Sequence, residues 1–176
     1  MPTQEENLII QSYAAVCLVT ELKNNKFLES ECFERLIFGY PEIKKIIVDT
    51  NVDSQGFFLM AIYAMLVVPH ELIEKTYVSE YAIVNDWIKE NTQNTNSNYA
   101  SDNLKINFLR HIRNAVAHAK VSFQPGMSVT FRDEGFNKKT KCNEKFSTDL
   151  PLCCAGELIN KLGTIHIKYI GNIPPP

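Results

Sequence analysis

The spacing of apolar side chains in the first third of the chain predicts a series of helices. Residues 4–23 place apolar side chains three or four positions apart, and Thr3 followed by acidic residues is suited to capping that helix. Shorter helices are expected at 30–38 and 41–48. Residues 57–68 are apolar without interruption, which predicts a central helix with neighbours on all sides.

Helical spacing returns after this run and continues beyond the middle of the chain. It covers residues 71–88 with a break expected near 76–79, and an amide-rich loop is expected at 91–98. Ser101 is a good N-cap residue, so a long helix is expected from there to about Lys120. The first two thirds of the chain are therefore predicted to be largely helical.

The pattern changes to an alternation of apolar and polar residues in the last third of the chain. Residues 121–124 and 128–133 alternate on either side of Pro125–Gly126, as the strands of a hairpin do. Residues 141–148 are expected to add a third strand. Helical spacing resumes only after this β region.

Together these elements predict a mainly α fold, a helical bundle with a small β-hairpin or three-stranded insertion before the last helix. A length of 176 residues, with 45% apolar and 22% charged residues, suits one compact domain. We expect a helical core at about 3–120, a β region at about 121–148 and a C-terminal helix at about 151–170.

The composition of the chain points to a reducing compartment and away from membranes. Its five cysteines form an odd set without a CxxC pair, so neither a disulfide framework nor a zinc site is indicated. The apolar run at 57–68 is far shorter than the roughly 20 residues that span a bilayer. The acidic residues near the N-terminus do not resemble a secretory leader. We expect a cytoplasmic protein that has no membrane partner.

Positive charge is concentrated in one region, although the net charge of the chain is −2. Residues 1–104 carry 7 Lys and Arg against 15 Asp and Glu, whereas residues 105–145 carry 9 against 3. Such a concentration is the electrostatic footprint that binding of a polyanion requires. It is equally the footprint of a solvated helix face, so charge alone does not decide between the two.

The predicted helix at 101–120 has one apolar and one polar side. The side expected to face the core carries Leu104, Phe108, Leu109, Ile112, Ala115, Val116 and Ala119. Amide and imidazole side chains form a stripe on the opposite side, which consists of Asn107, His111, Asn114 and His118. Cations flank the stripe at Arg110, Arg113 and Lys120. This polar side combines the groups that phosphodiester chemistry uses.

The polar side suits proton transfer combined with phosphate binding. Histidine takes or gives a proton near neutral pH, and a guanidinium holds phosphate oxygens through paired, charge-assisted hydrogen bonds. Arg113 and His118 are five residues apart, hence about 140° around a helix and roughly 7.5 Å along it. They therefore bracket a shallow patch, in which Asn114 orients the imidazole or binds the phosphate. Because no acidic side chain lies on this face, we expect chemistry without a metal or another cofactor.

The segment Arg113-Asn-Ala-Val-Ala-His118 resembles the R-x4-H motif of HEPN domains (higher eukaryotes and prokaryotes nucleotide-binding). The hairpin expected at 129–133 is similar to that of bacterial and plasmid-borne members of this family. The resemblance implies a HEPN-like helical bundle that forms a homodimer, with two motif helices lining one cleft. Many HEPN proteins are metal-independent endoribonucleases of toxin, abortive-infection or CRISPR systems, so it also implies RNA as a partner and an antitoxin or regulatory protein as another.

The resemblance assigns roles to the residues that match the motif. Arg113 would bind phosphate, His118 would act as acid or base, and Asn114 would support both. The small Ala117 would let the partner helix approach closely. We expect further RNA contacts from the neighbouring side chains Arg110, His111 and Lys120, although none of these three belongs to the motif.

Two other interpretations of the polar side stay open. One is a catalytically inactive HEPN-like module that binds a nucleotide or another protein through the same patch. The other is a polar face with a purely structural role. His166, in the predicted last helix, is expected to be structural or exposed.

Overall fold

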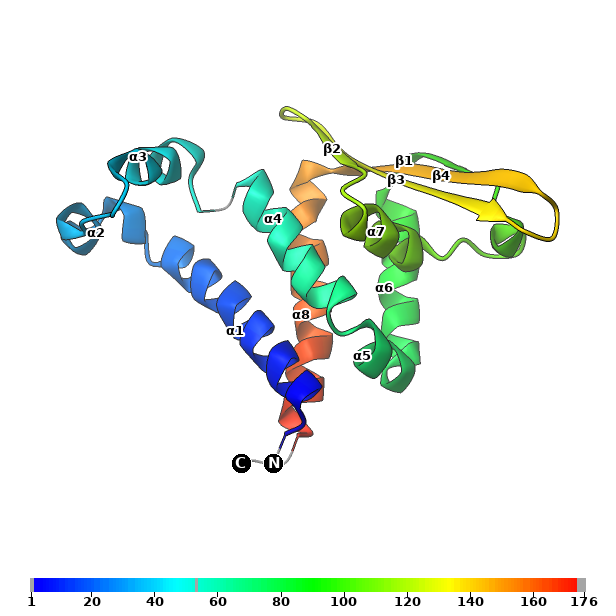
Figure 1. Cartoon of the computed structure of the whole chain (residues 1–176), viewed down its shortest axis with the longest axis horizontal. Coiled ribbons are helices and arrows are strands. Elements are labelled where there is room, and N and C mark those ends of the chain that lie inside the picture. The colour runs from blue at the N-terminus through cyan, green and yellow to red at the C-terminus, as the bar shows by residue number, and fades with distance from the viewer. Residues whose placement is uncertain (1, 53, 174–176) are drawn as a thin grey trace.

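The computed structural model describes residues 2–52 and 54–173. Its α-helices in these residues are α1 (Gln4–Asn24), α2 (Glu31–Arg35), α3 (Pro41–Thr50), α4 (Gln55–Ile62), α5 (His70–Thr76), α6 (Val78–Asn91), α7 (Phe108–Ala117) and α8 (Leu152–Gly171). Shorter helical turns are η1 (Phe27–Glu29), η2 (Tyr63–Val67) and η3 (Ala100–Asp102). The strands are β1 (Gln93–Ser97), β2 (Val121–Gln124), β3 (Ser128–Asn137) and β4 (Cys142–Pro151). The predicted mainly α fold is confirmed (Figure 1).

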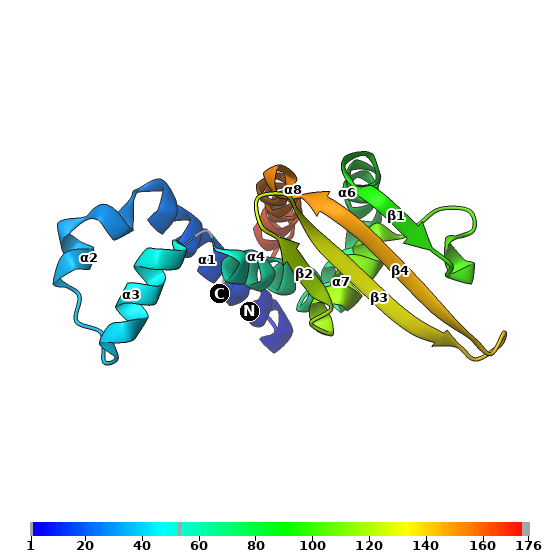
Figure 2. The same ribbon diagram turned by 90° about the horizontal axis from the view of Figure 1, so that it is seen from above.

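The first helix forms as its sequence predicts and leads into an arm. Thr3 accepts a hydrogen bond from the backbone N–H of Glu6, whose carboxylate in turn accepts one from the Thr3 N–H. Beyond α1, the short α2 and the longer α3 lie apart from the other helices (Figures 1 and 2). The helix expected at 30–38 ends earlier, at Arg35.

The long apolar run forms α4 and then η2, a π-helical turn in which the Val68 N–H donates to the Tyr63 carbonyl. Ala61 and Ile62 are fully buried, but Met60 is 63% exposed and Tyr63 is 47% exposed. The expectation of burial on all sides is therefore wrong, because the core covers one side of this segment and leaves the other at the surface. No helix within the described residues is long and apolar enough to cross a membrane.

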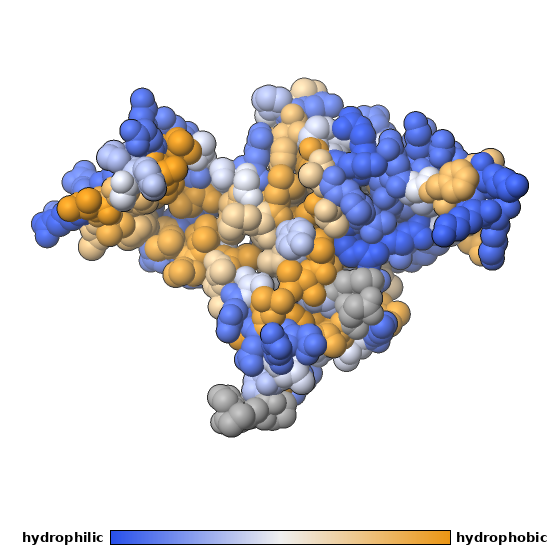
Figure 3. Space-filling view, viewed as in Figure 1, coloured by the Kyte–Doolittle hydropathy of each residue, from blue (hydrophilic) through white to orange (hydrophobic). Residues whose placement is uncertain are grey.

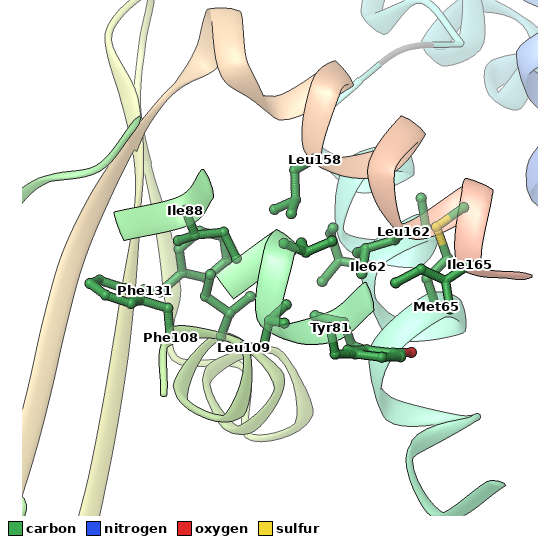
Figure 4. Close-up of a cluster of buried hydrophobic side chains, with 14 of the residues drawn as sticks. Ile62, Met65, Tyr81, Ile88, Phe108, Leu109, Phe131, Leu158, Leu162 and Ile165 are labelled. Carbon is green, nitrogen blue, oxygen red and sulfur yellow. The ribbon is translucent and has the colours of Figure 1, made fainter. Parts of the chain in front are cut away.

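The core lies where α4, η2, α6, α7 and α8 meet the sheet. Figure 4 shows side chains from these elements pointing toward one another: Ile62, Met65, Tyr81, Ile88, Phe108, Leu109, Phe131, Leu158, Leu162 and Ile165. Most of this set has less than 5% of its surface exposed. Burial of this size provides the main driving force for packing α7 against its neighbours.

The sheet has four antiparallel strands in the order β1–β4–β3–β2, and it lies across the ends of α6 and α8 with α7 beneath it (Figures 1 and 2). Gly126, at a φ of +70°, forms the predicted turn between β2 and β3. The inner face of β3 and β4 buries Val129, Phe131, Phe146 and Leu150, whereas no helix of residues 2–52 and 54–173 covers the outer face.

The prediction of a loop at 91–98 is wrong, because residues 93–97 form the fourth strand, β1. Its amide-rich side chains have no strand propensity, but its backbone pairs with β4. Asn94 donates to the Asp149 carboxylate, and Asn98 donates to the carbonyl of Asn143. Contacts with a distant strand therefore override the local signal.

Candidate functional site

The helix that carries the motif is shorter than predicted. It begins at Phe108 after an N-cap at Asn107, whose side chain accepts the Arg110 N–H at 3.0 Å. It ends at Ala117, with His118 as its C-cap. Ser101 was expected to cap a helix running to about Lys120 but lies in η3 instead.

A buried amide from α6 sets the point at which α7 begins. Asn85 is 7% exposed, its Nδ2 donates to the Ile106 carbonyl at 3.1 Å, and its Oδ1 accepts the Leu109 N–H at 3.3 Å. These bonds satisfy backbone groups just before and inside the first turn, where a helix leaves its N–H groups without partners. Asn85 thereby attaches the start of α7 to α6.

His111 is the centre of a buried polar cluster. Its Nδ1 lies 2.7 Å from an Asp133 oxygen, and its Nε2 lies 2.9 Å from an Asp102 oxygen. Its ring stacks on Phe146 with a centroid distance of 4.1 Å, and the Tyr99 ring lies 4.7 Å away. Nδ1 thus faces Asp133, and Nε2 faces both Asp102 and the Arg110 guanidinium at 2.9 Å, so each buried ring nitrogen has a polar partner, which is the condition for burying such groups.

The expectation that His111 shares an exposed stripe with His118 is therefore wrong. The side chain has no exposed surface, so it has none to offer to RNA in this chain. The physical reason is that η3 and β3 place carboxylates on both sides of the ring. The nearby Tyr99 lies in the same environment. The pKa of its hydroxyl is raised, mainly by burial and to a smaller extent by the charge and the hydrogen bond of Asp133.

The two flanking cations expected to contact RNA are engaged in bonds within the chain. Arg110 Nη2 donates to Ser101 at 2.8 Å and to Asp102 at 3.2 Å. Lys120 donates to Glu134 at 2.8 Å. Both cations keep some exposure, 29% for the Arg110 side chain and 39% for that of Lys120, so RNA contacts by them stay a prediction.

Arg113 and Asn114 are held together one turn before the end of α7. Asn114 Nδ2 donates to Asp133 at 3.1 Å, and its Oδ1 accepts a hydrogen bond from Arg113 Nη2 at 3.3 Å. Arg113 Nη1 lies 3.4 Å from a Glu74 oxygen of α5, and the arginine side chain is 19% exposed. The guanidinium therefore reaches the surface with its orientation fixed through Asn114 to the sheet.

His118 is exposed at the C-terminal end of α7, next to the exposed Ala117. Its backbone N–H donates to the Asn114 carbonyl at 3.0 Å, which fixes the position of its Cα. Within the described part of the chain, its imidazole makes no hydrogen bond or ion pair, so both ring nitrogens are available to a ligand. The two motif residues thus differ: Arg113 is anchored and His118 is uncommitted.

An apolar hollow with a volume of about 290 Å³ lies beside this end of α7. It is lined by Leu59, Met60, Tyr63, Val116, Ala119 and Val121. Figure 3 shows hydrophobic surface over α4 on the same face, with hydrophilic surface over the sheet. The motif therefore lies at the boundary between an apolar and a polar surface.

The family model described as HEPN pEK499 p136 matches residues 1–169. The chain belongs to this HEPN family. The match confirms the resemblance that the motif suggested. Comparison with curated proteins and with solved structures gives no match. The roles of single residues in this HEPN protein therefore rest on its own geometry.

The carboxylates that surround His111 in this HEPN chain were not predicted from the sequence. One signal was present: strand alternation places Asp133 on the same face as the buried Val129 and Phe131, and a buried carboxylate needs a partner. Asp102 gave no such signal, because it lies in a turn. The two carboxylates face opposite nitrogens of one ring, and no cluster in the described residues brings three possible metal ligands together.

Proposed function

We propose that this HEPN protein is an endoribonuclease that cleaves single-stranded RNA in a cleft between two copies of the chain, without a metal, as part of a toxin or defence system. One observation carries the proposal. The uncommitted imidazole of His118 lies one turn beyond Arg113 and Asn114, which are held in place by Asp133. This pairing supplies a proton-transfer group and a phosphate-binding group on one helix end.

The reaction follows from these two groups. The 2′-hydroxyl oxygen of RNA attacks the adjacent phosphorus, the bond from phosphorus to the 5′-oxygen breaks, and the products are a 2′,3′-cyclic phosphate and a 5′-hydroxyl. One imidazole takes the proton of the 2′-hydroxyl, and another gives a proton to the leaving oxygen. Arg113 stabilises the negative charge that develops on the phosphate oxygens.

A second copy of α7 completes this site. One chain supplies one His118, whereas the reaction uses a base and an acid at the same time. The exposed Ala117 allows close approach of another helix, and the apolar hollow beside it offers surface that a partner would cover. The partner's own His118 would then supply the second proton-transfer group. An antitoxin or regulatory protein would act by covering this same face.

The test is cleavage of a fluorescently labelled single-stranded RNA by the purified protein in the presence of EDTA. We expect shortened products that end in 2′,3′-cyclic phosphate. Arg113→Ala and His118→Ala should each lower the cleavage rate by at least a hundredfold, within the range by which general acid–base catalysis accelerates reactions. Arg35→Ala is the matched control, since this exposed arginine of α2 pairs with Glu31 one turn earlier on the same helix.

A non-catalytic nucleotide-binding module is the second candidate, and the contact between Arg113 and Glu74 favours it. A guanidinium that shares a carboxylate at 3.4 Å can still hold a ground-state phosphate, but it has less charge to offer to the additional negative charge that develops only in a transition state. This candidate predicts that the RNA stays intact, while saturable nucleotide binding is lost in Arg113→Ala. Intact RNA with a dimeric, folded protein contradicts the nuclease proposal.

A further inference from the structure

The β3–β4 hairpin carries a cluster of lysines that the candidate site does not use. Register pairs Asn137 with Cys142, so the hairpin loop consists of Lys138, Lys139, Thr140 and Lys141. In Figures 1 and 2 this end of the hairpin projects beyond the helices of the core. We call residues 136–141 the hairpin tip.

The lysines of the tip have no charged partner in the part of the chain that the structure describes. All three are exposed, and none forms an ion pair within the described part of the chain. The nearby acids are already engaged: Glu134 accepts from Lys120, and Glu144 accepts from Asn137 at 2.9 Å and from the Ala100 N–H at 3.0 Å. The tip is therefore locally positive in a protein of net negative charge.

The loop that presents these lysines is ordered by its own hydrogen bonds. Asn137 Oδ1 accepts the backbone N–H groups of Lys139 and Thr140 at 3.0 Å and 3.2 Å. Lys141 adopts a φ of +55°, which closes the loop onto β4. A preformed loop loses less conformational entropy when it binds a ligand.

An exposed aromatic ring accompanies the charges. Phe136 is 60% exposed and lies on the outer face of the sheet opposite Asn143. A ring beside cations is the combination with which proteins hold single-stranded nucleic acids, because bases stack on the ring and phosphates pair with the cations. A single ring offers little surface to a lipid bilayer, so a nucleic acid fits the tip better than a membrane does.

The tip is connected to the motif helix through β3. Asp133, which binds Asn114 and His111, lies on β3 five residues before Lys138, the first residue of the hairpin loop, hence roughly 17 Å away in the direction of the strand. A strand of RNA that leaves the motif can follow β3 to the tip along the part beyond Phe131, where β3 no longer pairs with β2. The tip thus offers RNA contacts in addition to any by Arg110 and Lys120, which are engaged in bonds inside the chain, whereas His111 is buried.

We propose that the hairpin tip is a second RNA-binding surface, on which Phe136 stacks with a base while Lys138, Lys139 and Lys141 contact phosphates. The identity of the ligand rests on the proposed function, but the binding itself does not require cleavage. The tip holds the strand outside the cleft and so contributes to affinity for long RNA.

The test measures binding of a fluorescein-labelled, single-stranded 2′-O-methyl RNA that is long enough to reach from the motif to the tip, and that cannot be cleaved because its 2′-oxygen is blocked. We expect the full-length wild-type protein to bind it by fluorescence anisotropy. The triple variant Lys138→Gln, Lys139→Gln, Lys141→Gln should bind at least tenfold more weakly. The slope of log affinity against log salt should become shallower by about 2, since three phosphate contacts are lost.

A charge-matched control separates a local contact from a change in net charge. It combines Lys26→Gln, Lys45→Gln and Lys89→Gln, three exposed lysines outside the hairpin, and should bind as the wild type does. Phe136→Leu should weaken binding about fivefold or more without changing the salt slope, and Phe136→Tyr should restore it. Unchanged thermal melting shows that each variant is folded.

Binding of vesicles that contain anionic phosphatidylserine is measured in parallel for the wild type and the tip triple variant. Three outcomes overturn the proposal: the wild type does not bind RNA, the two triple variants bind RNA equally, or the tip triple variant loses binding to the vesicles but not to RNA. The cleavage assay is scored separately. If the wild type cleaves RNA and the tip variant binds RNA as tightly as the wild type, the tip proposal is refuted and the nuclease proposal stands. If the wild type does not cleave RNA but the tip variant loses RNA binding, the tip proposal is supported and the nuclease proposal is contradicted.

Discussion

The groups at the candidate site fall into two kinds: buried and partly buried groups that hydrogen-bond one another, and the exposed imidazole of His118. Asp133 accepts hydrogen bonds from His111 and Asn114, and Asn114 in turn accepts one from Arg113. This chain of bonds lowers the number of orientations open to Arg113 before a phosphate arrives, which is the preorganisation that electrostatic catalysis needs. His118 has no such bonds and is the group that a substrate or a partner would orient.

His166 is a buried histidine outside this chain of bonds, and it makes stability depend on pH. Its Nδ1 lies 3.0 Å from the Leu162 carbonyl, its Nε2 has no hydrogen-bond partner among the described residues, and its ring stacks on Tyr13. Burial lowers its pKa, although the Leu162 carbonyl opposes the shift. In the unfolded chain the imidazole has its ordinary pKa of about 6.5 and is protonated below that pH, whereas in the folded chain it stays neutral to lower pH. Stability from this residue is complete above that pH and falls as the pH drops below it.

Replacing this ring by one that cannot be protonated should remove the dependence. We expect the free energy of unfolding of wild type, measured in urea, to fall below pH ~6.5 by up to about 1.4 kcal/mol per pH unit more steeply than that of His166→Phe. Thr164→Val, at an exposed position of α8, should retain the wild-type slope. Parallel profiles for the wild type and His166→Phe between pH 8 and 5 contradict the argument.

At the scale of helices and strands, local patterns predicted the elements that are stabilised locally. The cap at Thr3, the turn at Gly126 and the start of α8 lie where the sequence places them, because their signals are in adjacent residues. The bundle and its family were likewise accessible from the apolar spacing and the motif. These signals act over a few residues and do not depend on the rest of the fold.

The elements that were missed depend on distant partners. The start of α7 is decided by Asn85, more than twenty residues earlier, and β1 exists because β4 pairs with it. The burial of His111 depends on Asp133, which lies 22 residues later in the chain. Helix periodicity places a side chain on a face, but it cannot say whether another segment covers that face. The start of α7 and the burial of His111 therefore could not be predicted from local sequence patterns.

Asp133 is the residue through which β3 positions α7, and its removal should loosen that contact. Asp133→Ala leaves the buried His111 and the Asn114 amide without their acceptor, so we expect the free energy of unfolding to fall by about 3 kcal/mol in a urea titration. Glu134→Gln, on the exposed outer face of the same strand, should stay near the wild-type value. Equal stability of Asp133→Ala and Glu134→Gln shows that the contact does not hold α7.

At the scale of the whole molecule, the two surfaces around the motif have different characters. The apolar hollow and α4 lie on one side, and the polar sheet with its projecting hairpin lies on the other (Figures 1 and 3). A second copy that covers the apolar side would leave the hairpin free. In the proposed nuclease, pairing of chains and capture of RNA would therefore use separate surfaces that meet at His118.

This division predicts that a charge in the apolar hollow separates the two copies and stops cleavage. Met60, 63% exposed on α4, lines the hollow, so Met60→Glu would place a carboxylate in the dimer contact, where an unpaired buried charge costs several kcal/mol. We expect light scattering after size exclusion to give a dimer mass for the wild type and a monomer mass for the variant, with cleavage reduced at least a hundredfold. Met127→Glu is the matched control, since this methionine is 69% exposed in the turn between β2 and β3. A wild-type monomer that cleaves RNA refutes the composite site, and a Met60→Glu dimer places the contact elsewhere.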